Sequence, residues 1–466
     1  MRILLFFPPD VKVCEYMYGK DVSYRFTKTN IIPPLTLAYL AAILLEKGHD
    51  VDILDSNALG LSFKEIMNYI KKFNPDIVMA TMVSGSFMAT LKWVKAIKDR
   101  INCMTAVGGI HPTLYPREVL THKCIDYICI GQGWITVGEL ADALDKKKPL
   151  KNVKGIGYRE GEKIILTATQ PPIPKDYKLP FPARQLLPNE KYFTVISKRS
   201  PITSFLSSSG CPFSCIYCDI DRNVILRDPL DVVKEIEECV YKFGIKEIMF
   251  YDETFTLDKK RVHKICDEII KRKIDIVWGM RTRVDCVDRE LIFKMAKAGC
   301  IRANLGIESG DEEMLKFIKK YIPLGQIKKA VKWCNEAGMD VFGYFMMGLP
   351  NETRETIKKT IEFSKQLDLD YIQVSRYTPF PHTEAYEMMK KATGKDFWRD
   401  HTLGKVSLEQ LKGFGFKVSE KELDYWLKRA YREFYFRPSY IFKTLKKVKS
   451  FKELKGLIVS ATSLMK

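Results

Sequence analysis

The chain has 466 residues, of which 46% are hydrophobic and 29% are charged, and its formal net charge is +19. This length allows two or three domains with a sizeable core, and the composition excludes a disordered chain. No stretch approaches the ~20 apolar residues of a membrane span, and the N-terminus lacks the length and the cleavage site of a secretory signal. Twelve cysteines without a disulfide framework indicate reduced thiols, so we expect a cytoplasmic protein.

Strands and helices alternate over residues 1–135. The predicted strands are 3–7, 51–54, 77–81, 105–107 and 127–130, and the predicted helices are 35–47, 63–73 and 87–100. This rhythm predicts a Rossmann-like open parallel sheet, whose ligands bind beyond the C-terminal strand ends. The residues expected at that edge are Asp55, residues 84–86, Gly108, Gly109, His111, Thr113, Gly131 and Gly133. Its glycines let a flat ligand approach the backbone.

The rest of the chain divides into three parts. Over residues 136–195 the sequence predicts a helix, a small hairpin at 155–166 and a proline-rich linker. Residues 196–390 return to strand–helix alternation, with strands at 204–207, 247–250, 275–279, 301–306, 340–346 and 371–374. Six such units predict a partial (β/α)₆ barrel with its chemistry at the C-terminal strand ends. Residues 391–466 are predicted to form a helical, basic C-terminal region. The predicted fold class is therefore α/β throughout, ending in a helical tail.

Much of the positive charge lies in this C-terminal region. Residues 428–466 contain eleven Lys or Arg and two Glu, interleaved with Tyr431, Phe434, Tyr435, Phe436, Tyr440, Phe442 and Phe451. A basic face with aromatic anchors suits anionic lipid headgroups or a polyphosphate backbone. A solvated, Lys-rich helical tail is the alternative.

A cysteine triplet follows the first barrel strand. Cys211, Cys215 and Cys218 stand in a CxxxCxxC run. Three thiolates at this spacing can hold an iron–sulfur cubane and leave its fourth iron open to a small molecule, whereas four-cysteine clusters are closed. Tyr217 can cover such a cluster or stack on a bound base. Buried structural cysteines, or a zinc site that lacks its fourth ligand, are the alternatives.

Charged residues follow the next strands. Asp252 and Glu253 come after the second barrel strand and can hold the ammonium of a methionine moiety, although Asp252 can equally cap a helix. Arg283 comes after the third strand and can pair with a carboxylate. Glu308 and Ser309 lie in the Gly-Ile-Glu-Ser-Gly run that follows the fourth.

In this order, the motifs resemble one branch of the radical S-adenosylmethionine (SAM) superfamily, the enzymes with a cobalamin-binding domain. Their relatives include the anaerobic magnesium-protoporphyrin ester cyclase, hopanoid-modifying enzymes and many C-methyltransferases. The resemblance covers roughly residues 1–390 and the segment 432–440. It implies that the three cysteines hold a [4Fe-4S] cluster, and that SAM is contacted by Asp252, Glu253, Arg283, Glu308 and Ser309. It also implies that cobalamin is contacted by Gly108, Gly109, His111, Thr113, Gly131 and Gly133.

The sequence departs from the family pattern at several positions. Gln132 and Trp134 stand where the family usually has glutamates, and His382 stands where it commonly has glycine. No Asp-x-His-x-x-Gly run supplies a lower-face histidine to cobalt. His111 can approach the cobalt, or it can cap the turn at Pro112 and Thr113.

The resemblance implies a B12-dependent radical SAM enzyme that cleaves SAM to a 5′-deoxyadenosyl radical. Such a radical can modify an unactivated carbon by methyl transfer, cyclisation or C–C bond formation. The basic, aromatic tail favours a hydrophobic small-molecule substrate, a lipid or a tetrapyrrole, at an anionic membrane surface. An external ferredoxin or flavodoxin is the expected electron donor.

Two alternatives remain. An RNA-modifying, methylthiotransferase-like enzyme would need N-terminal cysteines for a second cluster. Cys14, Cys103, Cys124 and Cys129 are widely spaced, which argues against a nucleic acid substrate. A non-catalytic corrinoid- or cluster-binding sensor would leave the SAM-side motifs without a purpose.

Overall fold

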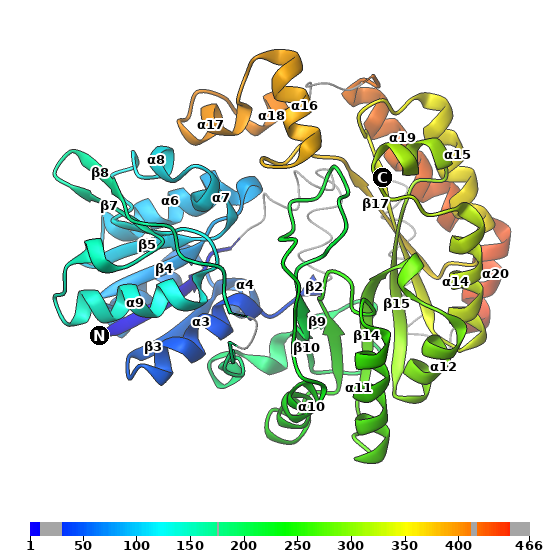
Figure 1. The fold of residues 1–466 in the computed structure, drawn as a ribbon, viewed down its shortest axis with the longest axis horizontal. Helices are drawn as coiled ribbons and strands as arrows, with labels where there is room; N and C mark the ends of the chain where they lie inside the picture. Colours follow the sequence, from blue (N-terminus) through cyan, green and yellow to red (C-terminus); the bar gives the residue numbers. More distant parts are fainter. Residues whose placement is uncertain (10–29, 175–176, 412–416, 448–466) are drawn as a thin grey trace.

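The computed structural model describes residues 1–9, 30–174, 177–411 and 417–447. Two α/β units lie side by side, each built on a mostly or wholly parallel sheet, and a group of short helices spans them (Figure 1). This arrangement confirms the predicted fold class.

The first sheet has seven strands in the order β3-β1-β4-β5-β6-β7-β8. Its strands are β1 (Arg2–Phe7), β3 (Asp50–Asp55), β4 (Ile77–Thr81), β5 (Met104–Gly108), β6 (Tyr127–Cys129), β7 (Ile156–Glu160) and β8 (Lys163–Leu166). The strands from β3 to β6 are parallel, whereas β7 and β8 form an antiparallel hairpin. The hairpin that we placed in the connector thus extends the first sheet. The strand order reverses direction beside β1, and ligands bind at such a switch point in open α/β sheets.

Helices cover both faces of this sheet. Buried side chains of α3 and α9 pack on one face, and those of α5 and α6 pack on the other. The helices of this part are α3 (Leu35–Glu46), α4 (Ser56–Leu59), α5 (Phe63–Phe73), α6 (Phe87–Lys98), α7 (Ile110–Leu114), α8 (Pro116–Val119) and α9 (Gly133–Asp145). The apolar periodicity of α5 and its Ser62–Glu65 capping box explain why it begins where predicted.

The second sheet has six parallel strands in sequential order and curls into part of a barrel (Figure 1). Its strands are β10 (Ile202–Phe205), β13 (Glu247–Phe250), β14 (Val277–Arg283), β15 (Cys300–Glu308), β16 (Asp340–Met347) and β17 (Tyr371–Arg376). The helices on its convex side are α10 (Pro229–Glu237), α11 (Lys259–Lys271), α12 (Arg289–Lys297), α13 (Glu312–Phe317), α14 (Leu324–Glu336) and α15 (Arg354–Gln366). The largest apolar core of the described chain lies between these two layers.

Two short strand pairs complete the sheets. β11 (Ser208–Ser209) pairs with β12 (Ile225–Leu226), and this pair closes the base of the cysteine loop. β2 (Asn30–Ile31) pairs with β9 (Phe193–Thr194), which joins the segment before α3 to the connector.

A helical bridge joins the carboxyl ends of both sheets. It consists of α16 (Glu384–Thr393), α17 (Phe397–Thr402) and α18 (Leu408–Leu411). The Nε2 of His111 lies 2.9 Å from Thr402 Oγ1, and Tyr115 donates a hydrogen bond to Asp396 (3.0 Å). At its other end the bridge meets the cysteine loop, because Ala385 N–H donates to Ile216 O (2.9 Å).

Helices α19 (Glu420–Tyr435) and α20 (Pro438–Lys447) cover the free edge of β17. The hydroxyl of Tyr435 accepts from Ile372 N–H (3.0 Å), and that of Tyr431 accepts from Val374 N–H (2.9 Å). Phe434 is fully buried beneath them. These aromatic residues are therefore part of the barrel's own packing.

Candidate functional site

The cysteine loop begins where β10 ends. Gly210, just before Cys211, has φ 82°, and a Cβ there would collide with the carbonyl of Asn223. Only glycine fits this turn without a backbone shift. Cys211 N–H donates to Asp221 O (2.9 Å), and Arg222 donates to the carbonyls of Phe213 and Cys218. The loop is thus folded by its own contacts.

The three thiols suit a shared cluster. Cys211 and Cys215 are buried, and Cys218 is partly exposed. Burial raises the pKa of the Cys218 thiol, and the neighbouring charges of Cys215 and Cys211 act in the same direction. No three His, Cys, Asp or Glu side chains of the described residues are grouped to hold a metal ion. A cubane does not require such a group, because each thiolate binds a different iron. These residues therefore fit the [4Fe-4S] cluster.

Asp252 holds the base of the loop. Its carboxylate accepts hydrogen bonds from Ser207 N–H (2.8 Å), Ser207 Oγ (2.5 Å) and Ser208 Oγ (2.5 Å). It is fully buried, and burial raises its pKa against the effect of these bonds. The helix-capping alternative is wrong, because Asp258 caps α11. The geometry gives Asp252 a role in placing the loop.

Glu253 is differently placed. Its Oε2 is buried and has no hydrogen-bond partner, and burial raises the pKa of this carboxyl. A buried carboxylate oxygen without a donor is costly, and the ammonium of a bound ligand would satisfy it. Glu253 thus fits the predicted contact with the methionine moiety of SAM.

Arg283 lies against the cysteine loop. It donates to both carboxylate oxygens of Asp285 (2.9 and 2.8 Å) and to Lys320 O (2.9 Å), and its Nη1 is 3.5 Å from Cys215 Sγ. Its guanidinium also stacks on the ring of Phe213, 3.8 Å from the centroid. The guanidinium nitrogens that we expected to bind the SAM carboxylate thus contact Asp285, Lys320 and Cys215. In this structure Arg283 therefore stabilises the loop.

Glu308 ends β15 with φ 69°, an uncommon conformation for a residue other than glycine. Its Oε1 accepts a hydrogen bond from the buried Lys320 Nζ (2.8 Å). A strained residue held by a buried partner suits a ligand-binding position. Ser309 is fully buried and bonds to Thr360 (3.1 Å) of α15, away from the loop.

The predicted cobalamin edge lies at the carboxyl ends of β4, β5 and β6. Gly109 has φ 103°, and a Cβ there would lie 2.7 Å from Met82 O. Thr113 Oγ1 donates to Gly109 O (2.8 Å) and accepts from Gly131 N–H (2.9 Å). Gly131 is exposed, has φ 81°, and nothing lies within 4 Å of its added Cβ. The backbone at Gly131 therefore offers the open surface that a corrin ring needs.

At the other two glycines of this edge an added Cβ would meet its neighbours only at ordinary contact distances. A Cβ on Gly108 would meet Cys129 at 3.4 Å, and one on Gly133 would meet Leu40 at 3.7 Å. Gly133 is the first residue of α9.

His111 does not point toward a ligand. Its ring is fully buried, with Nδ1 3.1 Å from Ser84 Oγ and Nε2 2.9 Å from Thr402 Oγ1. Nδ1 is thus used within the first α/β unit, and Nε2 is used in the contact between that unit and the helical bridge. The structure does not support a contact between His111 and the cobalt.

The two family departures at this edge have clear roles. Gln132 Nε2 donates to Asp221 Oδ2 (3.3 Å) on the cysteine loop, and Trp134 packs near Tyr39 of α3. Gln132 therefore links the cobalamin edge directly to the cysteine loop.

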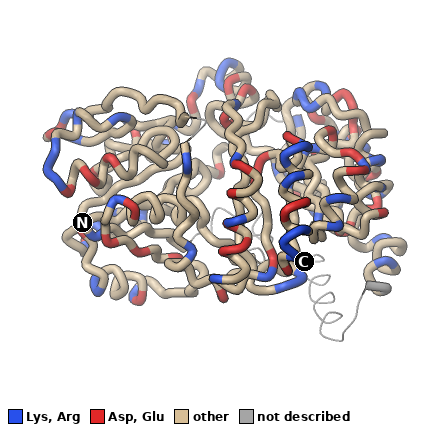
Figure 2. Tube along the Cα trace, turned by 60° about the horizontal axis from the view of Figure 1, so that its bottom comes forward, with Lys and Arg blue, Asp and Glu red and all other residues tan. Residues whose placement is uncertain are grey.

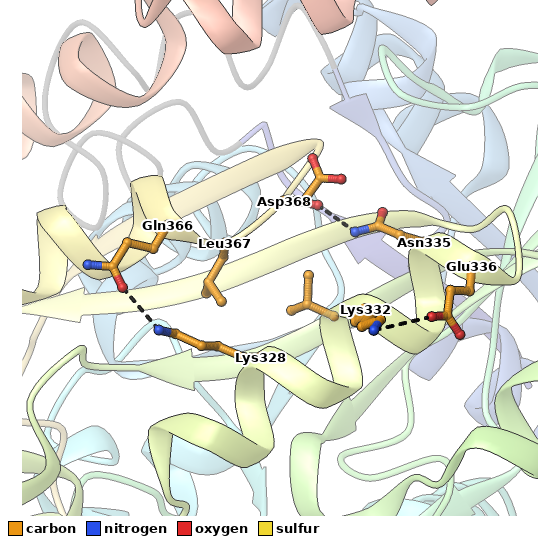
Figure 3. Close-up of a pocket in the computed structure, with 8 residues that line it drawn as sticks. Lys328, Lys332, Asn335, Glu336, Gln366, Leu367 and Asp368 are labelled. Atoms are coloured by element: carbon orange, nitrogen blue, oxygen red, sulfur yellow. Dashed lines mark hydrogen bonds and ion pairs between the residues drawn. The ribbon is translucent and has the colours of Figure 1, made fainter.

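A surface cavity of about 310 Å³ lies elsewhere, on the convex side of the second sheet between α14 and the end of α15 (Figure 3). Its lining residues are Lys328, Val331, Lys332, Asn335, Glu336, Gln366, Leu367 and Asp368. Lys328 donates to Gln366, and Asn335 donates to the carbonyl of Asp368. The cavity contains none of the predicted site residues.

Basic and acidic residues are interspersed over the described chain (Figure 2). In the C-terminal region Arg429 pairs with Glu433 (2.5 Å), and Lys443 pairs with Asp368 (2.6 Å) and Asp370 (3.0 Å). Of the predicted aromatic anchors, Tyr431, Phe434, Tyr435 and Tyr440 pack internally, whereas Phe442 is exposed. Phe451 and the other residues after 447 lie outside the described residues.

Sequence reasoning missed several residues of the site. Ser207, Ser208 and Arg222 shape the cysteine loop, Lys320 pairs with Glu308, and Thr254 lies 3.8 Å from Cys211 Sγ. The position of the two serines at the end of a strand was the available signal for them. Lys320 carried no such signal, because it lies on a connection after α13.

Comparisons with known proteins find two family domains in the chain. Residues 25–141 match the B12 binding domain, and residues 205–364 match the radical SAM superfamily.

The relatives extend the match over nearly the whole chain. An uncharacterized methyltransferase, PH0819, of Pyrococcus horikoshii is 34% identical over 453 residues, which cover 96% of this chain and 95% of that protein. The anaerobic magnesium-protoporphyrin IX monomethyl ester cyclase of Rubrivivax gelatinosus is 31% identical over 76% of this chain and 66% of its own length. The solved structure of the cobalamin-dependent radical SAM enzyme OxsB, with aqua-cobalamin and SAM bound, has a TM-score of 0.72 at 18% identity, covering 99% of this chain and 70% of that one. This last likeness concerns the fold alone.

Proposed function

The chain belongs to the family of radical SAM enzymes that carry a B12-binding domain, and from this membership we propose that it transfers a methyl group to an unactivated carbon of a hydrophobic small molecule. Its cofactors are a [4Fe-4S] cluster, SAM and cobalamin. The name of the Pyrococcus horikoshii relative, a methyltransferase, supports methyl transfer. The cyclase relative supports cyclisation as the second candidate.

One observation carries the proposal. Gln132, beside the open backbone of Gly131, donates a hydrogen bond to Asp221 on the cysteine loop (3.3 Å). A ligand on the Gly131 backbone and a ligand on the three thiols would therefore lie close to one another. Methyl transfer to a carbon radical needs this proximity, because the acceptor must reach both cofactors.

When bound, the cluster and SAM supply a 5′-deoxyadenosyl radical, and cobalamin supplies a methyl carrier. The chain's own residues have supporting tasks. Asp252 and Arg283 fix the loop that bears the thiols. Glu253 offers a buried acceptor to an ammonium group, and the helical bridge holds the two sheets together. An electron must come from an external donor such as ferredoxin or flavodoxin.

The test begins with the thiols. Replacing Cys211, Cys215 and Cys218 together by Ala should abolish iron–sulfur absorption and all SAM cleavage, whereas Cys239→Ala, a buried cysteine of the segment after α10, should change neither. Iron retained at wild-type stoichiometry in the triple variant would refute the cluster assignment.

Products separate the two candidate reactions. Loss of the SAM methyl group leaves S-adenosylhomocysteine, and reductive cleavage leaves 5′-deoxyadenosine. Methyl transfer should therefore give both products together, whereas cyclisation should give 5′-deoxyadenosine alone. Anaerobic turnover followed by chromatography of these two products decides between them.

The membrane location is a finer part of the same proposal. No helix among the described residues has the length and apolar character to cross a membrane. Residues 448–466 contain four lysines and one glutamate, and basic residues near an anionic surface contribute about 1 kcal/mol each. Truncation after residue 447 spares α20 and should lower co-sedimentation with anionic vesicles, but not with neutral ones. Equal binding of the full-length and the truncated protein to anionic vesicles would contradict the proposed membrane location.

A further inference from the structure

The buried cysteines around the second sheet differ in the group that faces their sulfur. Cys300 Sγ lies 3.6 Å from the carbonyl oxygen of Arg302, and Cys286 Sγ lies 3.9 Å from Asp285 Oδ1. Both partners are acceptors, so each contact uses the proton of a thiol. A thiolate has no proton to donate, and its sulfur is stabilised by donors instead. The buried sulfurs of the cysteine loop face donors.

Cys215 faces a group that can only donate. Arg283 Nη1 lies 3.5 Å from Cys215 Sγ, and a guanidinium carries N–H groups and no acceptor. Asp285 accepts from Nε and Nη2 of Arg283, and the carbonyl oxygen of Lys320 also accepts from Nη2. Nη1 is thus the nitrogen that is left for the sulfur. Both Arg283 and Cys215 are buried, so little water reaches this contact.

The other two thiols of the loop have different surroundings. Thr254 Oγ1 lies 3.8 Å from Cys211 Sγ, and both residues are buried. Toward a thiolate the threonine hydroxyl can only donate. Cys218 is partly exposed, so solvent can reach its side chain. The protein therefore places a donor beside each of the two buried sulfurs, one from the end of β14 and one from the segment after β13.

Hydrogen bonds to the cysteine sulfurs and nearby charge help to set the reduction potential of an iron–sulfur cluster. Reduction adds one electron, which converts [4Fe-4S]²⁺ to [4Fe-4S]⁺ and breaks no bond. The sulfurs of the reduced cluster carry more negative charge, so a donor stabilises the reduced state more than the oxidised state. The positive charge of Arg283 acts in the same direction, and its burial limits screening by solvent. Asp285 offsets part of this charge from the other two nitrogens.

We propose that hydrogen bonds from Arg283 and Thr254 to the two buried cysteine sulfurs raise the reduction potential of the cluster, so that the external one-electron donor can reduce it. Arg283 has the larger effect, because it is charged and lies closer to its sulfur. This rests on the proposed function, since it concerns the cluster of the same site. It adds an electronic role to the structural role of Arg283.

The experiment uses the full-length protein, reconstituted anaerobically with iron and sulfide and kept free of SAM. A redox titration, followed by the electron paramagnetic resonance signal of the reduced cluster, gives the midpoint potential. In Arg283→Met the equilibrium constant for reduction should fall about ten-fold, which lowers the potential by about 59 mV for one electron. Arg283→Lys keeps the charge and should lower the potential less. Thr254→Val removes the hydroxyl at nearly constant shape and should also give a smaller decrease.

Arg222→Met is the matched control. Arg222 is a second arginine at the cysteine loop, and it donates to the carbonyl oxygens of Phe213 and Cys218. Its loss should loosen the loop and lower the iron content, without a comparable change in the potential of the cluster that remains. Iron and sulfide are determined for every variant, so that each potential refers to a known amount of cluster.

Three outcomes would overturn the proposal. The first is a wild-type potential in Arg283→Met at full iron content, and the second is an equal shift in Arg222→Met. The third is loss of iron from both Arg283 variants and from Thr254→Val, which would assign these residues to cluster retention alone. If only Arg283→Met loses its iron, the potentials of Arg283→Lys and Thr254→Val decide. A wild type that takes up no cluster would instead refute the proposed function.

Discussion

His382 Nδ1 lies 2.7 Å from Asp219 Oδ1. Asp219 directly follows Cys218, the third cysteine of the loop. His382 adopts φ 65°, a left-handed conformation that favours glycine. A histidine at this position accepts backbone strain of about 1–3 kcal/mol, and its contact with Asp219 offsets part of that cost. The cysteine loop is thus held from the barrel side by His382 and from the first sheet by Gln132.

His382→Gly should relieve the strain and release the loop. We expect the free energy of unfolding to stay equal or rise, because glycine adopts this conformation freely. Amide hydrogen exchange of residues 211–222 should become faster. His382→Asn, which tolerates the same conformation, is the control for strain. Unchanged exchange in both variants would show that the contact does not order the loop.

Asp252→Asn and Asp252→Ala should destabilise the cysteine loop more than they affect SAM directly. Alanine leaves the buried Ser207 N–H and both serine hydroxyls without an acceptor, at a cost of about 1–3 kcal/mol for each unsatisfied group, whereas asparagine keeps one acceptor oxygen and loses the other. Thermal unfolding and iron content should both fall. Asp258→Ala, which removes the cap of α11, should lower the unfolding free energy by about 1 kcal/mol and keep the iron. Full iron retention in Asp252→Ala would contradict this role.

Glu308 permits a test that separates strain from binding. Both Glu308→Ala and Glu308→Gly remove the partner of Lys320, but glycine adopts φ 69° without strain. The free energy of unfolding should therefore be higher by about 1 kcal/mol for Glu308→Gly than for Glu308→Ala. If Glu308 contacts SAM, both variants should bind SAM about ten-fold more weakly or worse. Wild-type SAM affinity in both would leave Glu308 a structural residue.

Gly109 and Gly131, the two glycines with positive φ at the predicted cobalamin edge, should respond differently to an added side chain. Gly131→Leu places its side chain in open space and should prevent cobalamin binding, with a strain cost of about 1–3 kcal/mol. Gly109→Leu should unfold this region, because its Cβ already meets Met82 O at 2.7 Å. Cobalamin absorption after gel filtration, together with circular dichroism, distinguishes the two effects. A Gly131→Leu protein that binds cobalamin normally would remove Gly131 from the site.

His111 should make the junction between the first sheet and the helical bridge sensitive to acid. Burial, followed by the charges of His401 and His122, lowers the pKa of His111 to about 3. Between about pH 6.5 and pH 3 the unfolded chain binds a proton that the folded chain excludes, so the stability is present above pH 6.5 and is lost as the pH falls. The free energy of unfolding should fall by up to about 1.4 kcal/mol for each pH unit in this range. His111→Gln should flatten the slope in urea unfolding, whereas His263→Gln should not.

The strands could be predicted because their apolar runs and following glycines are local signals. β3, β4 and β13 lie within one residue of their predicted bounds at each end. The roles of Asp252 and Arg283 could not be predicted. The spacing of the motifs shows at which strand end a charged residue lies, but it does not show which group that residue contacts. Asp252 meets serines about 45 residues earlier, and Arg283 meets a thiol 68 residues earlier. His111 meets Thr402, 291 residues away, through a bridge that no motif indicates.

The contacts of Tyr431 and Tyr435 with β17 have a consequence for the protein's behaviour in concentrated solution. An outer strand with free N–H and C=O groups is a template on which another chain can add a strand. Each tyrosine hydroxyl accepts from a β17 N–H and donates back to the carbonyl of the same residue, Val374 or Ile372. Two side chains thus occupy the positions that a seventh strand would take. A chain that lost α19 would expose this ladder and should self-associate through β17.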